Sequence, residues 1–325
     1  MRRSPARAFT ALFAAAALTA AGLSVAHASS DAPSESITME DSTGATWQIA
    51  SFSPPTRAQG GDAVIVPDSA GSGDLDALVG AVLDPELPDE VAAAFAPGEP
   101  GPQTRVVIGN DDRTRITNVT ASPYVQMPYF IFTAADGSTS GCTGWLYGNR
   151  TLATAAHCLS DGAGNWYSNY RVYFGLNEST AYAQCGNSVL AAPTGWDGKA
   201  GSDYDWGVIV LNCNAGTVLG TMGFKAPEGI PVGNWSITGY PADKLPERTM
   251  WTHAGPVTHK TSNTWMYSID SYHGQSGAPI WRLEAGSACG NCVIGIHTTG
   301  GSMNSGVRIT STVGGALKAY SERYP

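Results

Sequence analysis

Three short runs carry side chains that together can perform acyl transfer. His157 stands in TAAHC at 154–158, Asp205 opens an apolar run in DYDWGVIV at 203–210, and Ser276 stands in GQSGAP at 274–279. A serine hydroxyl is a poor nucleophile at neutral pH, so it needs a base to take its proton. An imidazole takes and returns that proton near pH 7, and a carboxylate fixes its tautomer. The order His, Asp, Ser therefore predicts a serine triad.

The glycines on either side of Ser276 let the backbone turn tightly there. Such a turn can aim the amides of Gly274 and Ser276 at a developing oxyanion, and one such donor contributes roughly 2.7–4 kcal/mol to transition-state stabilisation. Ala278 replaces the last glycine of a Gly-x-Ser-x-Gly elbow, which disfavours the hydrolases that use one. Taken singly, these residues read as a core histidine, a cap and a turn. Only their combination predicts catalysis.

The elements that must position these groups are short and rich in β-formers. Glycine, asparagine, aspartate and proline separate them, and no repeating helical partner lies between them, which is typical of an antiparallel barrel or sandwich. Residues 316–324 predict a C-terminal helix. The predicted strands are 124–134, 151–156, 171–176, 206–211, 235–240, 265–269, 278–283, 293–299 and 307–310.

The N-terminus has the pattern of an export signal. Three arginines precede a short apolar stretch at 8–22, and Ala-His-Ala at 26–28 fits a cleavage site. We therefore expect a signal peptide at 1–28 and a secreted protein. No later stretch reaches about 18 apolar residues, so no membrane segment is expected.

Residues 29–105 differ from residues 106–325 in composition and charge. The earlier region holds 13 acidic residues and two arginines, whereas the later one holds 14 acidic and 13 basic residues. The near-neutral main region gives no electrostatic case for nucleic-acid binding. Within the acidic region, the apolar spacing at 75–83 predicts a helix capped by Asp74 or Ser72, and a second short helix is expected at 89–95.

All six cysteines follow residue 140, and an even number in an exported domain predicts three disulfides. The spacing alone leaves the pairing open. Cys289 and Cys292 also fit a redox motif or half a zinc site. A strand rather than a helix is predicted after Cys292, and no further ligands stand at suitable spacing, so we interpret the pair as a small structural loop and expect no metal.

From residue 106 onward the chain resembles the bacterial glutamyl endopeptidases, a family of chymotrypsin-fold serine peptidases. The resemblance implies an all-β fold of two antiparallel six-stranded barrels, roughly 106–215 and 216–325, with the triad in the cleft between them and a C-terminal helix. It is carried by VVIGNDDR at 106–113, GCTGW at 141–145, TAAHC at 154–158, YDWG at 204–207, TGYPADK at 238–244, WTHAGP at 251–256, GQSGAP at 274–279 and IGIH at 294–297.

The resemblance also implies the disulfides. Cys142 would bridge to Cys158 and hold the hairpin that carries His157, with a loop that constrains the unfolded chain by about 3 kcal/mol. Cys289 would bridge to Cys292, which leaves Cys185 for Cys213.

In this family a histidine on the strand after the nucleophile binds the side chain that precedes the cut. His297 matches that position, Ser271 matches a pocket hydroxyl, and the mature N-terminus, here Val106, would bring its amine to the pocket. A carboxylate that loses water needs such donors, so we expect cleavage after Glu and more weakly after Asp. His273 departs from the family's usual glycine and is expected at the pocket rim, as a further substrate-binding residue.

The acidic region 29–105 then reads as a propeptide, with 106–325 as the mature peptidase. We expect a cut between Arg105 and Val106 by another peptidase, because a glutamate-specific enzyme cuts poorly after arginine. Glu99 offers an earlier self-processing site. Gln275 replaces the aspartate that pairs with the new N-terminus in digestive relatives of trypsin, so that switch cannot operate unchanged.

Expected partners are protein and peptide substrates and the activating peptidase, with no cofactor, no nucleic acid, no membrane and a monomeric enzyme. Three alternatives stay open from the sequence. They are a chymotrypsin-fold endopeptidase of other specificity, a catalytically inactive secreted binding module and an exported esterase.

Overall fold

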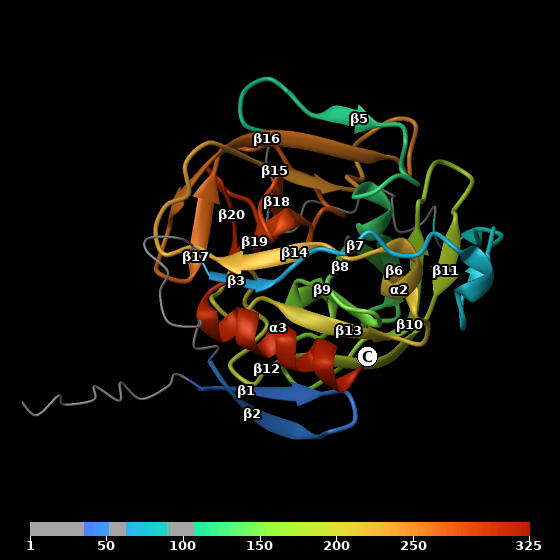
Figure 1. Cartoon of the computed structure of the whole chain (residues 1–325), viewed down its shortest axis with the longest axis horizontal. Helices are drawn as coiled ribbons and strands as arrows, with labels where there is room; N and C mark the ends of the chain where they lie inside the picture. Colours follow the sequence, from blue (N-terminus) through green and yellow to red (C-terminus); the bar gives the residue numbers. More distant parts are fainter. Residues whose placement is uncertain (1–35, 52–62, 90, 92–106) are drawn as a thin grey trace, which may run out of the picture. The chain divides into compact units, whose positions relative to one another are not determined.

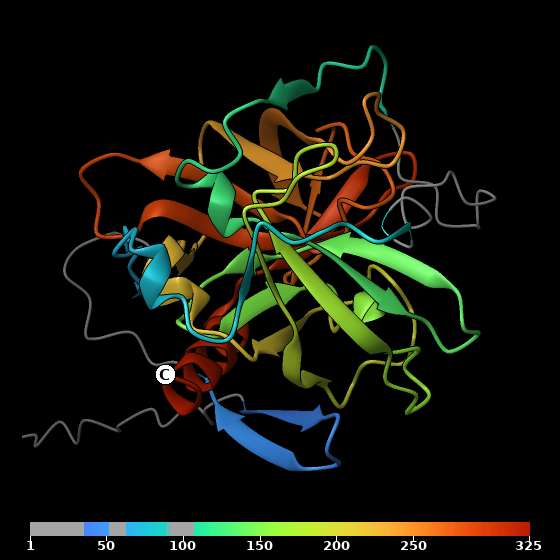
Figure 2. The same cartoon turned by 90° about the vertical axis from the view of Figure 1, so that its right-hand side faces the viewer.

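The computed structural model describes residues 36–51, 63–89, 91 and 107–325, and most of their regular structure is β-strand. The expected signal peptide and both sides of the expected cut, Arg105 and Val106, lie outside the described residues. We call residues 36–91 the leading segment, because they precede the region that carries the predicted triad. Figures 1 and 2 draw its strands in blue and cyan.

Antiparallel strands between residues 129 and 211 pair around a closed ring of six. Two ring members are bent, and each is interrupted at a glycine, Gly144 between β7 and β8 and Gly186 between β11 and β12. A Cβ at Gly144 would lie 2.5 Å from Leu152 Cδ2, so the bend has no room for a side chain. The strands are β6 (Tyr129–Thr133), β7 (Thr139–Thr143), β8 (Trp145–Leu146), β9 (Thr151–Thr154), β10 (Ser168–Phe174), β11 (Ala183–Cys185), β12 (Asn187–Pro193) and β13 (Gly207–Leu211).

A second ring of six strands comes later in the chain. The path β18-β15-β16-β17-β20-β19 closes because β18 also pairs with β19. All pairings around this ring are antiparallel. The strands are β15 (Asn234–Gly239), β16 (Met250–His259), β17 (Thr264–Tyr267), β18 (Pro279–Glu284), β19 (Gly290–Thr299) and β20 (Asn304–Arg308).

These two rings confirm the predicted chymotrypsin-like fold. Two further strands extend the second ring: β5 (Thr114–Ile116) pairs with β16, and β14 (Gly223–Ala226) pairs with β19. The β14–β19 pairing is parallel, which departs from the expected all-antiparallel arrangement. Each ring has its own buried apolar core, and a third cluster includes residues of both halves of the chain.

The C-terminal helix α3 (Ser311–Arg323) is confirmed, and it begins five residues earlier than predicted. Thr310 caps it, because its hydroxyl accepts the amide of Val313 at 3.2 Å. A short helix α2 (Ala215–Leu219) and the 3-10 turns η2 (Tyr124–Gln126) and η3 (Ala156–Cys158) complete this part of the chain. Within the described residues, no helix has both the length and the apolar character that a membrane crossing requires.

The leading segment contains strands instead of the predicted first helix. Its elements are β1 (Ser36–Asp41), β2 (Thr46–Ala50), β3 (Ala63–Val66), the 3-10 turn η1 (Leu75–Ala77) and β4 (Val82–Leu83). Asp74 caps η1 as predicted, but the turn ends at Ala77 and Val82 already pairs with Gln184 of β11. The second predicted helix, at 89–95, lies almost wholly outside the described residues.

The three disulfides have the pairing that the resemblance implied. Cys142 is bonded to Cys158, Cys185 to Cys213, and Cys289 to Cys292. The first bond joins β7 to η3, and thus fastens the turn that carries His157 to a neighbouring strand.

Candidate active site

His157 lies in the 3-10 turn η3, directly after β9. Ala155 is extended, and the chain tightens into the turn at Ala156, which leaves the imidazole 18% exposed. Next to it, Cys158 is bridged to Cys142, and its carbonyl accepts the hydroxyl of Tyr170 at 2.7 Å. His157 is therefore held on a short, cross-linked turn.

Asp205 reaches His157 because β13 pairs with β9, with Gly207 opposite Thr154. Its carboxylate is fully buried and lies 2.9 Å (Oδ2) and 3.0 Å (Oδ1) from His157 Nδ1. The amides of His157 and Gly201 also donate to it, at 3.0 and 2.7 Å. These contacts leave both carboxylate oxygens engaged.

The pKa of Asp205 reflects two opposing effects. Burial raises the pKa of the carboxyl, but the charge of His157 and the hydrogen bonds from His157 and Gly201 outweigh burial and hold it below its ordinary value. Asp205 is therefore a stable anion that can support an imidazolium beside it.

Ser276 stands on a tight turn before β18. Its Oγ lies 2.8 Å from His157 Nε2, which completes the contact chain from carboxylate to alcohol. Gly274 and Gly277 have φ values of +94° and +82°, and a Cβ at Gly274 would lie 2.3 Å from the Tyr240 carbonyl oxygen. Both glycines are thus required by the backbone of this turn.

Thr143, at the end of β7, fastens this turn to the first ring of strands. Its amide donates to the Ser276 carbonyl at 2.8 Å, and its hydroxyl donates to the Gly274 carbonyl at 2.8 Å. The same hydroxyl accepts the amide of Tyr240 at 3.1 Å, and Thr154 donates to the Thr143 carbonyl at 2.9 Å. Thr143 belongs to the GCTGW run at 141–145, but that run did not predict its bridging role.

His297 is fully buried on β19, beside the nucleophile turn. The amide of Gly277 donates to the His297 carbonyl at 2.7 Å, and the amide of His297 donates to the Ala278 carbonyl at 2.8 Å. Its Nδ1 lies 2.7 Å from the hydroxyl of Tyr267. Burial raises the pKa of Tyr267 well above its ordinary value, so this hydroxyl keeps its proton.

Ser271 is also fully buried, and its hydroxyl has no hydrogen-bond partner among the described residues. The Oε1 of Gln275 accepts the amide of Tyr272 at 3.0 Å, so Gln275 stabilises its own turn. The predicted departure from the trypsin pattern thus corresponds to a local role for Gln275.

Asp270 is a buried carboxylate that no sequence motif predicted. Its Oδ1 accepts the amide of Ile108 at 2.8 Å, and its Oδ2 accepts the amide of Asp112 at 2.9 Å. Its own amide donates to Nδ1 of His253 at 2.8 Å. Asp270 directly precedes Ser271, and an acid six residues before the predicted nucleophile was the available signal. It anchors the chain two residues after Val106.

A second anchor lies a few residues further along. The side chain of Arg113 is fully buried and forms ion pairs with Asp111 at 2.9 Å and Asp243 at 2.5 Å, while Lys244 pairs with Asp111 at 2.5 Å. Burial lowers the pKa of Arg113, but both carboxylates outweigh it and raise that pKa above its ordinary value. Residues 111–113 are therefore fixed to the TGYPADK run at 238–244.

His273 is exposed and lines a hollow together with His157, Ser276 and Cys142. Phe132 and Tyr167 also line it, with parallel rings whose centroids are 5.1 Å apart. This hollow includes neither His297 nor Ser271, so His273 faces a recess beside the triad that the sequence did not predict.

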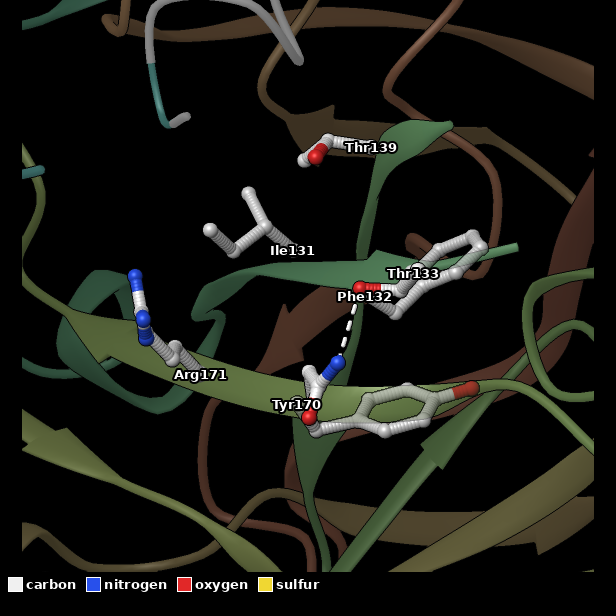
Figure 3. Close-up of a pocket in the computed structure, with 7 residues that line it drawn as sticks. Ile131, Phe132, Thr133, Thr139, Tyr170 and Arg171 are labelled. Carbon is white, nitrogen blue, oxygen red and sulfur yellow. Dashed lines mark hydrogen bonds between the residues drawn. The ribbon is translucent and has the colours of Figure 1, made fainter. Parts of the chain in front are cut away.

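A further hollow lies on β6, β7 and β10, and Figure 3 shows Ile131, Thr139 and Arg171 around it. Asn169 donates to the hydroxyl of Thr133 at 3.1 Å along its border. Its lining shares only Phe132 with the hollow beside the triad. It is a recess of the first ring and holds none of the three predicted catalytic residues.

Two clusters of the described residues have metal-ligand spacing, and neither fits a metal well. The first contains His157 with Cys142 and Cys158, whose sulfurs are joined in a disulfide and provide no thiolate. The second contains His253, Asp112 and Asp270, and the Asp270 carboxylate already accepts two amides.

Comparisons with known proteins identify relatives of this chain. Residues 142–295 match the family described as a trypsin-like peptidase domain. A glutamyl endopeptidase of Bacillus licheniformis is 34% identical over 233 residues, which cover 69% of this chain and 72% of the relative. A Bacillus subtilis protein named extracellular metalloprotease is 35% identical over 216 residues, 65% of this chain and 68% of the relative.

A solved structure is also similar to this chain. A Glu endopeptidase in complex with MPD is similar with a TM-score of 0.59 and 27% identity, over 67% of this chain and 100% of that one. The Bacillus licheniformis relative and the solved structure thus indicate the same family of peptidases.

Proposed function

The chain belongs to the glutamyl endopeptidase family of chymotrypsin-fold serine peptidases, and on that basis we propose that it cleaves peptide bonds after glutamate, and more weakly after aspartate. It is a serine endopeptidase. The observation that carries the proposed hydrolysis is the chain of contacts from Asp205 through His157 to Ser276, with 2.9 Å and 2.8 Å between the atoms that must exchange or hold a proton.

In the proposed reaction, Ser276 Oγ attacks the scissile carbonyl carbon while its proton passes to His157 Nε2. Asp205 keeps the imidazole oriented through Nδ1 and stabilises the imidazolium. The imidazolium then gives the proton to the leaving amine as the C–N bond breaks, which leaves an acyl-enzyme. A water attacks that ester, passes its proton to His157 and releases the acid, and Ser276 regains its proton.

The amides of Gly274 and Ser276 are the proposed oxyanion donors. The φ of +94° at Gly274 supports this role, because it allows the tight turn that carries both amides. The amide between them, that of Gln275, donates to the Tyr272 carbonyl at 3.1 Å and so belongs to the turn itself.

His297 supports the preference for a carboxylate. When the Tyr267 hydroxyl donates to His297 Nδ1, the proton of a neutral imidazole must sit on Nε2, which makes that nitrogen a donor. The buried hydroxyl of Ser271 and the amine of Val106 are the other proposed donors. Three donors replace the water that a glutamate side chain loses on binding.

Matched peptides that differ only in the residue before the cut test this preference. We expect kcat/KM to fall roughly ten- to a hundredfold from Glu to Gln, since a hydrogen bond to a charged group contributes roughly 1.5–3 kcal/mol. Asp should fall between them, because its carboxylate ends one methylene short. Faster cleavage after Leu or Arg would reject glutamate specificity and leave an endopeptidase of other specificity.

We further propose that the protein is secreted, that residues 1–28 are removed on export, and that another peptidase cuts between Arg105 and Val106. The two amides held by Asp270 support this cut, because they would fix the new N-terminus two residues from a permanent anchor. The mature enzyme is expected to act as a monomer on protein and peptide substrates.

Asp270→Asn tests the anchor. An amide side chain has only one acceptor oxygen for the two amides that the carboxylate now holds, so one of them loses its bond. We expect kcat/KM for a Glu peptide to fall about tenfold, mainly through KM, and the Glu-to-Gln ratio to shrink. Exposed Asp136→Asn is the matched control. An unchanged Glu-to-Gln ratio in Asp270→Asn would show that the two amide bonds of Asp270 do not affect the substrate pocket.

The name of the Bacillus subtilis relative suggests metal chemistry as a second candidate. The donor sets argue against it in this chain, since one cluster offers disulfide sulfurs and the other an engaged carboxylate. A peptidase that uses Ser276 is the function that these residues support best.

A further inference from the structure

The leading segment supplies a terminal strand to every sheet of the described structure. β2 and β1 end the six-stranded sheet beside β12, β4 ends the five-stranded sheet beside β11, and β3 ends the nine-stranded sheet beside β14. Exposed edge strands readily pair with other chains, and proteins protect them. A segment expected to be discarded thus covers three edges of the domain that would remain (Figure 1).

The leading segment contacts both β14 and the start of β19. Val66 pairs with Phe224, and the carboxylate of Asp68 accepts the amide of Asn291 at 2.9 Å and its side-chain nitrogen at 3.1 Å. These bonds hold the small loop closed by Cys289 and Cys292.

Helix α3 packs against the leading segment near both of its ends. A Cβ at Gly314 would lie 2.1 Å from Ile65 Cδ1, so the glycine leaves room for an isoleucine of the leading segment. A glycine inside a helix is unfavourable by about 1 kcal/mol relative to alanine, and this packing offsets that cost. At the other end of α3, the rings of Trp47 and Tyr320 make an edge contact, with centroids 6.1 Å apart, and Arg323 lies over Trp47.

Four apolar side chains of the leading segment are buried in the cores of the domain, those of Met39, Ile65, Leu78 and Val91. Met39 and Val91 are fully buried and Leu78 is 6% exposed, and they belong to the same clusters as ring residues. Near Leu78, Asn214 donates to the Ala77 carbonyl at 3.0 Å. Strand pairing and apolar burial hold the segment, not charge, because residues 106–325 are nearly neutral.

We propose that the leading segment stays bound after the backbone between it and residue 107 is cut, so that the processed protein is a non-covalent assembly of two chains. The proposal rests on the proposed function only in placing the natural cut after Arg105. None of its strand pairings involves the elements of His157, Asp205 or Ser276, and the hollow beside His157 and Ser276 is lined by residues between 132 and 276 alone. The segment acts as a permanent structural subunit and not as an inhibitor that blocks the active site.

The test cuts the chain on demand. A recognition sequence for a sequence-specific viral protease is inserted between Gly98 and Gly101 in a Ser276→Ala chain that starts at residue 29, so that self-processing cannot interfere. After the cut, native gel filtration at low and high salt is compared with filtration in guanidinium. We expect the two fragments to co-elute natively at both salt concentrations and to separate only in the denaturant.

Separate native elution of the two fragments, with residues after the cut still folded, would overturn the proposal. The readout is assembly and not hydrolysis, so it holds whether or not Ser276 is the nucleophile. A failure of the proposed peptidase activity and a failure of this proposal are therefore distinguishable.

Two neighbouring substitutions identify the face that binds. Leu78→Asp places a charge where the side chain is 6% exposed, and Val79→Asp does so where it is 70% exposed. After the cut, we expect retention of the fragment to weaken more than about tenfold for Leu78→Asp and less than about twofold for Val79→Asp. Equal retention of the two variants would overturn the proposal that this buried face holds the segment.

Discussion

Replacing Ser276 with alanine is expected to lower kcat for cleavage of a Glu peptide about a millionfold, the scale seen when a triad nucleophile is removed. The methyl group cannot attack the carbonyl carbon, so no acyl-enzyme forms. The His157 imidazole keeps its Asp205 partner and loses only the contact to Oγ. The measurement is single-turnover hydrolysis of a fluorogenic Glu peptide by the processed enzyme.

Ser268→Ala provides the matched control, because Ser268 is exposed on the same loop, between β17 and the nucleophile turn. It should leave kcat unchanged. An organophosphonate should label the parent and Ser268→Ala but not Ser276→Ala. Labelling that persists in Ser276→Ala would place the nucleophile elsewhere, and no labelling of any form would favour an inactive binding module.

Asp205→Asn is expected to lower kcat about ten-thousandfold, the scale of losing a triad carboxylate. The two oxygens of Asp205 accept the amides of His157 and Gly201 as well as His157 Nδ1. Either orientation of an asparagine turns its NH2 group towards one of these donors. The imidazole then favours the tautomer with its proton on Nε2, which cannot accept the proton of Ser276.

The same variant should change how stability depends on pH. The pKa of Asp205 is lowered in the folded state, so its carboxylate contributes stability above its ordinary pKa, and this contribution is lost as pH falls through the folded pKa. The difference in free energy of unfolding between parent and variant should therefore be largest near neutral pH and shrink in acid. A constant difference, measured by denaturant titration across that range, would contradict the assignment.

Local signals were sufficient to select three side chains that the structure brings into contact, and to predict most strands of the two rings. A histidine after a buried strand, an aspartate before another and a serine between glycines need no long-range knowledge to be noticed. The strands at 151–154 and 207–211 were predicted from β-branched and apolar runs, and their pairing is what brings Asp205 to His157.

The predicted helix at 75–83 was wrong because of contacts with distant parts of the chain. Its apolar spacing fits a helix, yet Val79 and Val82 are 70% and 55% exposed. Gly80 has a φ of +87°, and a Cβ there would lie 2.4 Å from the Asn212 carbonyl oxygen. The chain therefore turns against another part of the molecule and then pairs with β11.

The role of Asp270 and the placement of the leading segment were also beyond local reasoning. Asp270 accepts amides about 160 residues away in the chain, and β1 pairs with a strand about 150 residues later. Residues 29–105 differ from the rest of the chain in charge, but charge gives no information on strand pairing. The leading segment pairs with the edge strands of sheets, and these edges exist only in the folded domain.

Thr143 gives the two halves of the molecule a common fixed point. The hydroxyl and the amide of Thr143 form three hydrogen bonds with Gly274, Tyr240 and Ser276. These bonds attach the turn that carries Ser276 to the first ring. A hinge motion between the two rings would break these bonds and move Ser276 away from His157. We therefore expect the two rings to keep one relative position throughout the reaction.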